Sequence, residues 1–152
     1  MTPSLRPIAL AGGQILRALP LVRLTWPRVD QRGWEEFVAF IRNRAGGDGA
    51  GVIALGDEAN YLSGLIVYES EHDLEEGRVL TLHLFTAVDL VNSLAPIHSL
   101  YRTATAKADE LGCGGLQVRL HADQAAIAVH LRALGLSERA GYLWKKLATA
   151  PA

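Results

Sequence analysis

The stretch from Thr86 to Cys113, TAVDLVNSLAPIHSLYRTATAKADELGC, decides how the fold is read, because a strand gives way to a helix within it. Strand-like residues end at Asp89, and an alanine-rich helical pattern follows and ends at Gly112, which suits a C-terminal cap. In many α/β proteins, glycines in such a turn let the backbone approach a bound phosphate. The turn is therefore the first place to look for a ligand site.

The turn itself, from Asn92 to Ser99, reads NSLAPIHS and contains neither glycine nor arginine. Pro96 has no N–H to donate, and its fixed φ suits the first turn of a helix. Asn92 or Ser93 is expected to cap that helix and to fill the N–H groups that a phosphate would otherwise use. The sequence thus predicts a capped turn rather than a glycine-lined phosphate loop.

Composition narrows the class of protein. The chain has 152 residues, 49% hydrophobic and 20% charged, which fits one globular domain spanning residues 1–152. A formal net charge of -1 gives no overall basic field, so we expect no nucleic-acid partner. The apolar runs near the N-terminus are broken by arginine and proline, so no signal peptide or membrane span is expected. A lone cysteine, Cys113, cannot form an internal disulfide, which suits a cytoplasmic protein. A buried thiol is a better interpretation of it than a reactive nucleophile.

Periodicity predicts an order of elements that mixes hairpins with one crossover helix. Strands are expected at 5–10, 51–57, 61–70, 77–88 and 115–121, and a strand pair over 136–148. Helices are expected at 13–26 with a break at Pro20, at 31–44 with Asp30 as N-cap, at 100–112, and at 122–135 with Asp123 as N-cap. This order indicates an α/β fold whose central sheet is mixed and mostly antiparallel, with helices on both faces.

An acidic stretch, ESEHDLEEG at 69–77, separates two of these strands. It could hold a cation through Glu71, His72, Asp73 and Glu75, but it lacks the glycine and the spacing of a calcium loop. A solvated hairpin tip that protects a sheet edge is the favoured interpretation. Because no set of His, Cys, Asp and Glu has zinc-ligand spacing either, we predict no metal site.

The second half of the chain resembles the GCN5-related N-acetyltransferases. The segments LFTAVDLV, AKADELGC, DQAAIAVHLRALGL and AGYLWKKL are similar to that family's fourth strand, third helix, fourth helix and closing strand. The resemblance implies acetyl-CoA as cofactor and an amine as acceptor. It also implies that the cofactor is bound by the strand end Val88, Asp89, Leu90 and Val91, with Gln124 at a position where many members contact it. Arg102 could reach a phosphate in place of the missing loop, but an ordinary surface arginine on a helix is the favoured interpretation.

The resemblance has two departures. The family's basic, glycine-rich loop is absent between Asn92 and Ser99. Leu131 occupies the position where members often carry a tyrosine that protonates the departing thiolate. His130, one residue earlier, projects about 100° away on a helix and is a poor substitute.

Two side chains are candidates for a general base. His83 is expected on the fourth strand, on the face opposite Leu82 and Leu84, and histidine titrates near neutral pH. Glu69, at the end of the third strand, is the second candidate. For both, an ordinary polar residue on a half-covered sheet is the alternative.

Three hypotheses therefore stay open. The first is an acetyl-CoA-dependent N-acetyltransferase of unknown acceptor, the second an inactive member of the same fold that binds or regulates a partner. The third is an unrelated α/β binding domain. The closing strand, apolar at alternate positions, could also pair with a second copy to form a homodimer.

Overall fold

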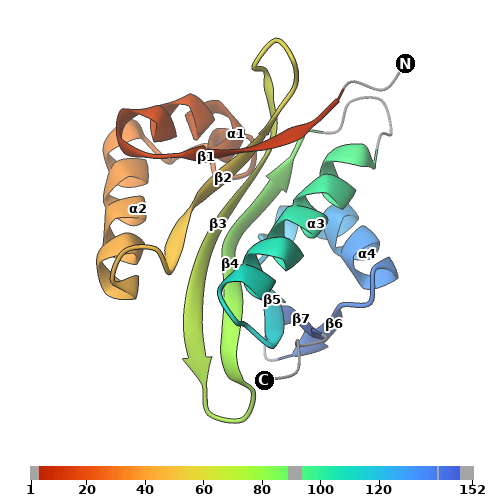
Figure 1. The fold of residues 1–152 in the computed structure, drawn as a ribbon. Helices are drawn as coiled ribbons and strands as arrows, with labels where there is room; N and C mark the ends of the chain where they lie inside the picture. Colours follow the sequence, from red (N-terminus) through yellow and green to blue (C-terminus); the bar gives the residue numbers. More distant parts are fainter. Residues whose placement is uncertain (1–3, 89–93, 140, 148–152) are drawn as a thin grey trace.

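The computed structural model describes residues 4–88, 94–139 and 141–147. In chain order the elements are β1 (Arg6–Leu10), the 3-10 helix η1 (Gly12–Ala18), α1 (Leu19–Thr25), α2 (Gln31–Ala45), β2 (Ala50–Gly56), β3 (Leu62–Asp73), β4 (Gly77–Ala87), α3 (Ala95–Glu110), β5 (Gly115–Val118), the 3-10 helix η2 (Ala122–Gln124), α4 (Ala125–Ala133), β6 (Ser137–Arg139) and β7 (Tyr142–Lys146) (Figure 1). This confirms the predicted order of elements.

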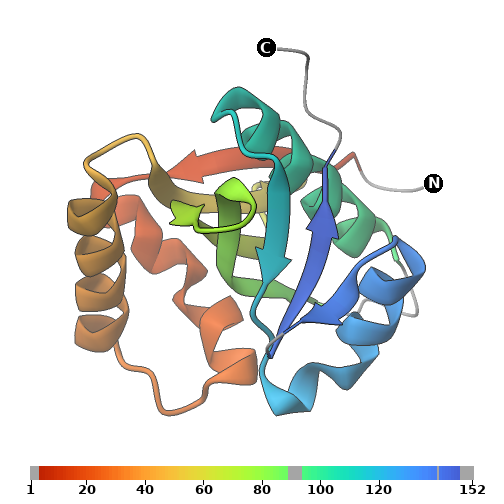
Figure 2. The same ribbon diagram turned by 90° about the horizontal axis from the view of Figure 1, so that it is seen from below.

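One sheet with the strand order β1-β2-β3-β4-β5-β7-β6 forms the centre of the molecule. Only the β4–β5 pair is parallel, so the sheet is mixed and mostly antiparallel, as predicted. Helices α1 and α2 cover one face, while α3 and α4 cover the other (Figures 1 and 2). Each face has its own core, which Trp34 of α2 and Leu100 of α3 exemplify. Within the described ranges, no helix is both long enough and apolar enough to cross a membrane.

Local sequence explains the entry to the first helical layer. The 3-10 helix ends at Ala18, and α1 begins with Pro20 in its first turn, where a missing N–H costs nothing. Asp30 caps α2 by accepting the N–H of Gly33 at 2.7 Å, as its position in the sequence predicts. The Asp30 cap fixes the end of the α1–α2 connection, which matters because this connection forms one wall of the pocket described below.

One predicted cap is wrong, and another lies outside the described residues. The N-cap position of α3 is Leu94, whose side chain cannot accept a hydrogen bond, and the predicted caps Asn92 and Ser93 are outside the described ranges. At the other helix, His121 rather than Asp123 is the cap, because a short 3-10 turn precedes α4 and shifts the cap two residues toward the N-terminus. His121 Nδ1 accepts the N–H of Asp123 at 3.1 Å.

The β3–β4 hairpin is tighter than the sequence suggests. Strand β3 continues to Asp73, so the acidic residues just before it lie in the sheet and not in a solvated tip. Asp73 Oδ1 accepts the N–H groups of Glu75 and Glu76, each at 2.9 Å, and these bonds hold the pKa of Asp73 below its ordinary value. Arg139, in β6, forms ion pairs with both glutamates. The turn is thus held by its own backbone and by one cation.

A β-bulge in β4 sets the geometry of the site. Val67 and Tyr68 are consecutive in β3, yet they pair with Leu84 and Leu82, so His83 is the extra residue. Leu82 therefore packs in the core beneath α3, and Leu84 packs in the core beneath α1 and α2. The prediction that both leucines share one face is wrong, because strict alternation fails at a bulge.

The same point of β4 is where its parallel pairing with β5 ends. The last paired residues are Leu82 and Val118, followed by one bond from the N–H of Arg119 to the carbonyl of Leu82. Beyond it, β4 continues to Ala87 without β5 beside it. The bulge and the opening between the strands thus coincide in the middle of the sheet.

Candidate active site

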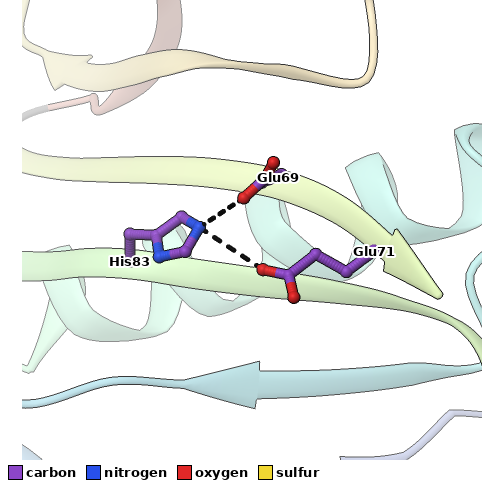
Figure 3. A group of neighbouring side chains, drawn as sticks. All are labelled: Glu69, Glu71 and His83. Atoms are coloured by element: carbon purple, nitrogen blue, oxygen red, sulfur yellow. Dashed lines mark hydrogen bonds and ion pairs between the residues drawn. The ribbon is translucent and has the colours of Figure 1, made fainter. Parts of the chain in front are cut away.

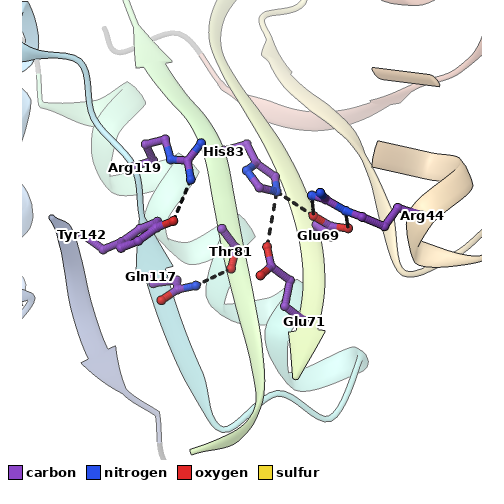
Figure 4. Close-up of polar contacts among 8 residues, drawn as sticks. All are labelled: Arg44, Glu69, Glu71, Thr81, His83, Gln117, Arg119 and Tyr142. Atoms are coloured by element: carbon purple, nitrogen blue, oxygen red, sulfur yellow. Dashed lines mark hydrogen bonds and ion pairs between the residues drawn. The ribbon is translucent and has the colours of Figure 1, made fainter. Parts of the chain in front are cut away.

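Three side chains form a hydrogen-bonded chain that starts at the bulge. His83 Nε2 lies 2.7 Å from Glu69 Oε1 on the neighbouring strand β3 (Figures 3 and 4). Arg44, from the last turn of α2, bonds to both oxygens of Glu69, through Nε at 2.8 Å and through a terminal nitrogen at 2.5 Å. Glu69 is only 2% exposed, so these partners replace the water that a carboxylate would otherwise bind.

This arrangement affects the charge of Glu69 and the tautomer of His83. The Arg44 guanidinium holds the pKa of Glu69 below its ordinary value, against the effect of burial, and His83 acts in the same direction. An ionised carboxylate can only accept hydrogen bonds, so the proton of the neutral imidazole lies on Nε2. The lone pair of His83 is then on Nδ1, which is the atom available to take a proton from another molecule.

Glu71 extends the cluster toward solvent. Its Oε1 lies 3.5 Å from His83 Nε2, and its side chain is partly exposed (Figure 3). Ligand atoms of Glu69, Glu71 and His83 lie within 4.8 Å of one another, so these three residues are the group in the described ranges that could hold a metal ion. However, the guanidinium of Arg44 already supplies a positive charge to Glu69. The cluster therefore has the composition of an ion-pair network rather than that of a metal centre.

Two hollows meet at His83. The first, here called the α1–α2 pocket, has a volume of about 450 Å³ and lies between the α1–α2 connection, α2 and β4. The second, called the α2 groove, has a volume of about 640 Å³ and runs along α2 over the ends of β3 and β5. Both are lined by Phe37, His83 and Arg119. The histidine is thus placed where a molecule in either hollow would meet it.

Two other residues bind each other beside His83. Arg119, just after β5, donates a hydrogen bond to the hydroxyl of Tyr142 on β7 at 2.6 Å, and its guanidinium lies 5.3 Å from the centre of that ring (Figure 4). A guanidinium has five N–H groups, so this bond fixes its position while leaving donors for a ligand. Arg119 is therefore a held cation on the wall of both hollows.

Gln124 forms hydrogen bonds beside the opening between β4 and β5. It is 5% exposed, and its Nε2 donates to the carbonyl of Phe85 in β4 at 2.7 Å, while its Oε1 accepts the N–H of His121 at 2.9 Å. Gln124 thus anchors η2 to the part of β4 that β5 does not cover. Of the predicted cofactor residues nearby, Val88 donates its N–H to Ser63 of β3 at 2.8 Å. Asp89, Leu90 and Val91 lie outside the described residues.

Several other predicted residues lie away from the His83 cluster. Arg102 is exposed and is the eighth residue of α3, about 10 Å along the helix axis from its start. Leu131 is fully buried in the core. Cys113 is 4% exposed, and burial raises the pKa of its thiol, so it is the inert buried cysteine that the sequence favours.

Arg44 and Arg119 are the site residues that sequence reasoning missed. The arginines in the last turn of α2 suit the helix dipole, and that explanation hides the role of Arg44. Its partner Glu69 is 25 residues away, and Tyr142 is 23 residues from Arg119. The sequence pointed only to Glu69 and His83, because they are polar residues in two consecutive, mostly apolar predicted strands.

Comparison with known proteins identifies the fold. No family model matches the sequence, and no curated protein matches it. Among solved structures, an aminoglycoside 6'-N-acetyltransferase from Acinetobacter baumannii is similar, with a TM-score of 0.71, 12% identity and coverage of 98% of each chain. An aminoglycoside N-acetyltransferase solved in complex with CoA gives a TM-score of 0.73 at 11% identity, covering 100% of this chain and 97% of the other.

A third similar structure is a glucosamine-6-phosphate N-acetyltransferase from Arabidopsis thaliana, with a TM-score of 0.64 and 10% identity over 97% of this chain and 98% of the other. The chain therefore has the fold of the GCN5-related N-acetyltransferases, as the sequence resemblance implies. This shared fold argues against the third hypothesis, an unrelated α/β domain.

Proposed function

We propose that this protein is an acetyl-CoA-dependent N-acetyltransferase that acts on a primary amine, with His83 as the general base. The observation that carries the proposal is the Arg44–Glu69–His83 chain, because it presents an imidazole with a fixed tautomer at the wall of two hollows. A base is what acetyl transfer to an amine requires, since an ammonium group must lose a proton before it can attack. In this proposal Glu69 and Arg44 position the histidine and do not touch the acceptor.

The opening between β4 and β5 fits the cofactor. Beyond Leu82 no strand pairs with the edge of β4 that faces away from β3 in the described ranges, and Gln124 takes the Phe85 carbonyl on that edge. In this proposal an extended arm of the cofactor lies along the edge and pairs with backbone groups there. The last residues of β4, and Val88 just after it, would hold this arm, as the fold resemblance implies. When bound, acetyl-CoA would supply the acetyl group as an activated thioester.

The chain's own residues then divide the remaining tasks. Nδ1 of His83 accepts the proton that the amine releases, and the ionised Glu69 stabilises the imidazolium that forms. Glu71, 3.5 Å from His83, attracts the incoming ammonium group. The aromatic ring of Phe37 lines both hollows and would contact the acceptor beside the reacting nitrogen. A proton donor for the thiolate is not supplied by Leu131, so solvent or another group has this task.

The inactive alternative makes a different prediction in a direct experiment. Purified protein is titrated with acetyl-CoA and with CoA by calorimetry, and thiol release is then followed with a panel of primary amines. A ligand at a hundred times its Kd should stabilise the fold by about 2.7 kcal/mol, which is visible as a thermal shift. Binding followed by thiol release supports the enzyme. Failure to bind at millimolar cofactor would leave the fold as a binding or regulatory module. In either case we propose that the protein is cytoplasmic and forms a homodimer.

A further inference from the structure

The α1–α2 pocket has two kinds of wall, which together restrict what it can hold. Its apolar wall consists of Val22, Trp26, Val29, Trp34, Phe37 and Leu84. Two cationic side chains, Arg28 and Arg119, line it as well. At about 450 Å³ the pocket is in the range of small-molecule sites and suits a body of the size of one aromatic side chain.

The charges of the pocket do not cancel within it. Neither Arg28 nor Arg119 forms an ion pair with any carboxylate in residues 4–88, 94–139 and 141–147. Of the described residues that line the pocket, only Asp30 carries a carboxylate, and its Oδ1 is already used as the cap of α2. The pocket thus offers two cations and one partly occupied anion to whatever enters it.

An amine acceptor is itself a cation in solution, so a net positive pocket opposes its entry. Like charges held at short range in a partly desolvated site cost affinity, and a polycationic amine would meet this repulsion repeatedly. A carboxylate on the same molecule reverses the sign, because arginine binds a carboxylate through two parallel N–H bonds. The apolar wall then receives the rest of the molecule.

We infer that the acceptor is an amino acid or a close analogue: a primary amine that carries a carboxylate near the nitrogen and an apolar, preferably aromatic, side chain. This inference rests on the proposed function, and it names the substrate class of the same site. Arg119 takes the carboxylate, since Tyr142 holds it in place beside His83. The amino group then faces His83, and the side chain occupies the aromatic wall.

Intrinsic fluorescence can test the inference without turnover, because Trp26 and Trp34 line the pocket. The protein is titrated, with and without CoA, with L-phenylalanine, with 2-phenylethylamine, which lacks the carboxylate, and with L-alanine, which lacks the ring. L-phenylalanine should bind about tenfold or more tightly than either analogue. The Arg119→Gln variant should lose the preference over 2-phenylethylamine, while Arg42→Gln, a change outside the pocket, should keep it.

Equal or tighter binding of 2-phenylethylamine would overturn the inference, and so would no response to L-phenylalanine at millimolar concentration under either condition. Thiol release from acetyl-CoA is measured with the same three amines. A carboxylate preference in binding without thiol release would retain the substrate class and reject the acetyltransferase. Thiol release from all amines, with or without a carboxylate, would support the acetyltransferase and reject the proposed substrate class.

Discussion

His83 Nε2 lies 2.7 Å from Oε1 of Glu69, a carboxylate that is 2% exposed and is held on its other side by Arg44. This contact links the one bulged residue of β4 to a buried charge on β3 and, through it, to the end of α2. It fixes the orientation of the imidazole and the site of its proton, which are the two properties that a general base needs.

Replacing the base should remove activity without removing the cofactor. We expect His83→Gln to lower kcat for acetyl transfer about a hundredfold or more, the usual contribution of a general base. The KM for acetyl-CoA should stay the same, because the proposed cofactor contacts are with the backbone of β4, which this substitution of a side chain retains. Steady-state thiol release measures both, and His130→Gln serves as control. An unchanged kcat in H83Q would exclude His83 as the base.

Removing the cation should destabilise the fold. Arg44→Leu leaves the buried Glu69 with one fewer charged partner, and we expect a loss of about 1–3 kcal/mol in the free energy of unfolding. Arg32→Leu, in the same helix, breaks an exposed pair with Glu36 and should cost less than about 0.5 kcal/mol. Urea denaturation compares the two. Equal effects would mean that the Arg44–Glu69 pair behaves as a surface pair.

The stability of the protein should depend on pH through Glu69. Folding lowers the pKa of this carboxyl from its ordinary value of 4.5, so its contribution is complete above that value and is lost as the pH falls through the lower folded pKa. Glu69→Gln should therefore destabilise the protein more at neutral pH than at about pH 3. Glu110→Gln, which alters an exposed pair with Lys107, provides the control. A difference between wild type and E69Q that is independent of pH would contradict the predicted shift.

Chelation should leave the protein unaffected. Because Arg44 supplies the positive charge that Glu69 requires, dialysis against EDTA is expected to change neither the thermal midpoint nor the rate of thiol release. Differential scanning fluorimetry and the enzyme assay provide the readouts. Loss of either property, restored by Zn²⁺ but not by Mg²⁺, would show that Glu69, Glu71 and His83 form a metal centre instead.

Replacing Gln124 should affect both the stability of the fold and the binding of acetyl-CoA. Gln124→Ala removes the bonds to Phe85 and His121 and leaves buried backbone groups without partners, at a cost of about 1–3 kcal/mol in unfolding free energy. Because the Phe85 carbonyl lies on the open edge of β4, the KM for acetyl-CoA should rise as well. The exposed Gln31→Ala is the control in both measurements. A stable Q124A protein with normal KM would show that these bonds carry little energy.

The amino-acid sequence alone determined most of the architecture. Hydrophobic periodicity, Pro20 and the Asp30 cap act over a few residues, so the elements and their order could be predicted from local rules. The resemblance in the second half of the chain then indicated the fold. His83 and Glu69 could be named as candidates, because polar residues within otherwise apolar strands are conspicuous in the sequence.

What only the tertiary structure decided is how those candidates act. A bulge at His83 depends on the register between β3 and β4, and register is a property of paired strands, which no single strand encodes. Glu69 meets Arg44 across 25 residues, and Arg119 meets Tyr142 across 23. Such contacts arise only when helices and strands pack, since side-chain directions and distances between elements follow from the fold and not from local spacing.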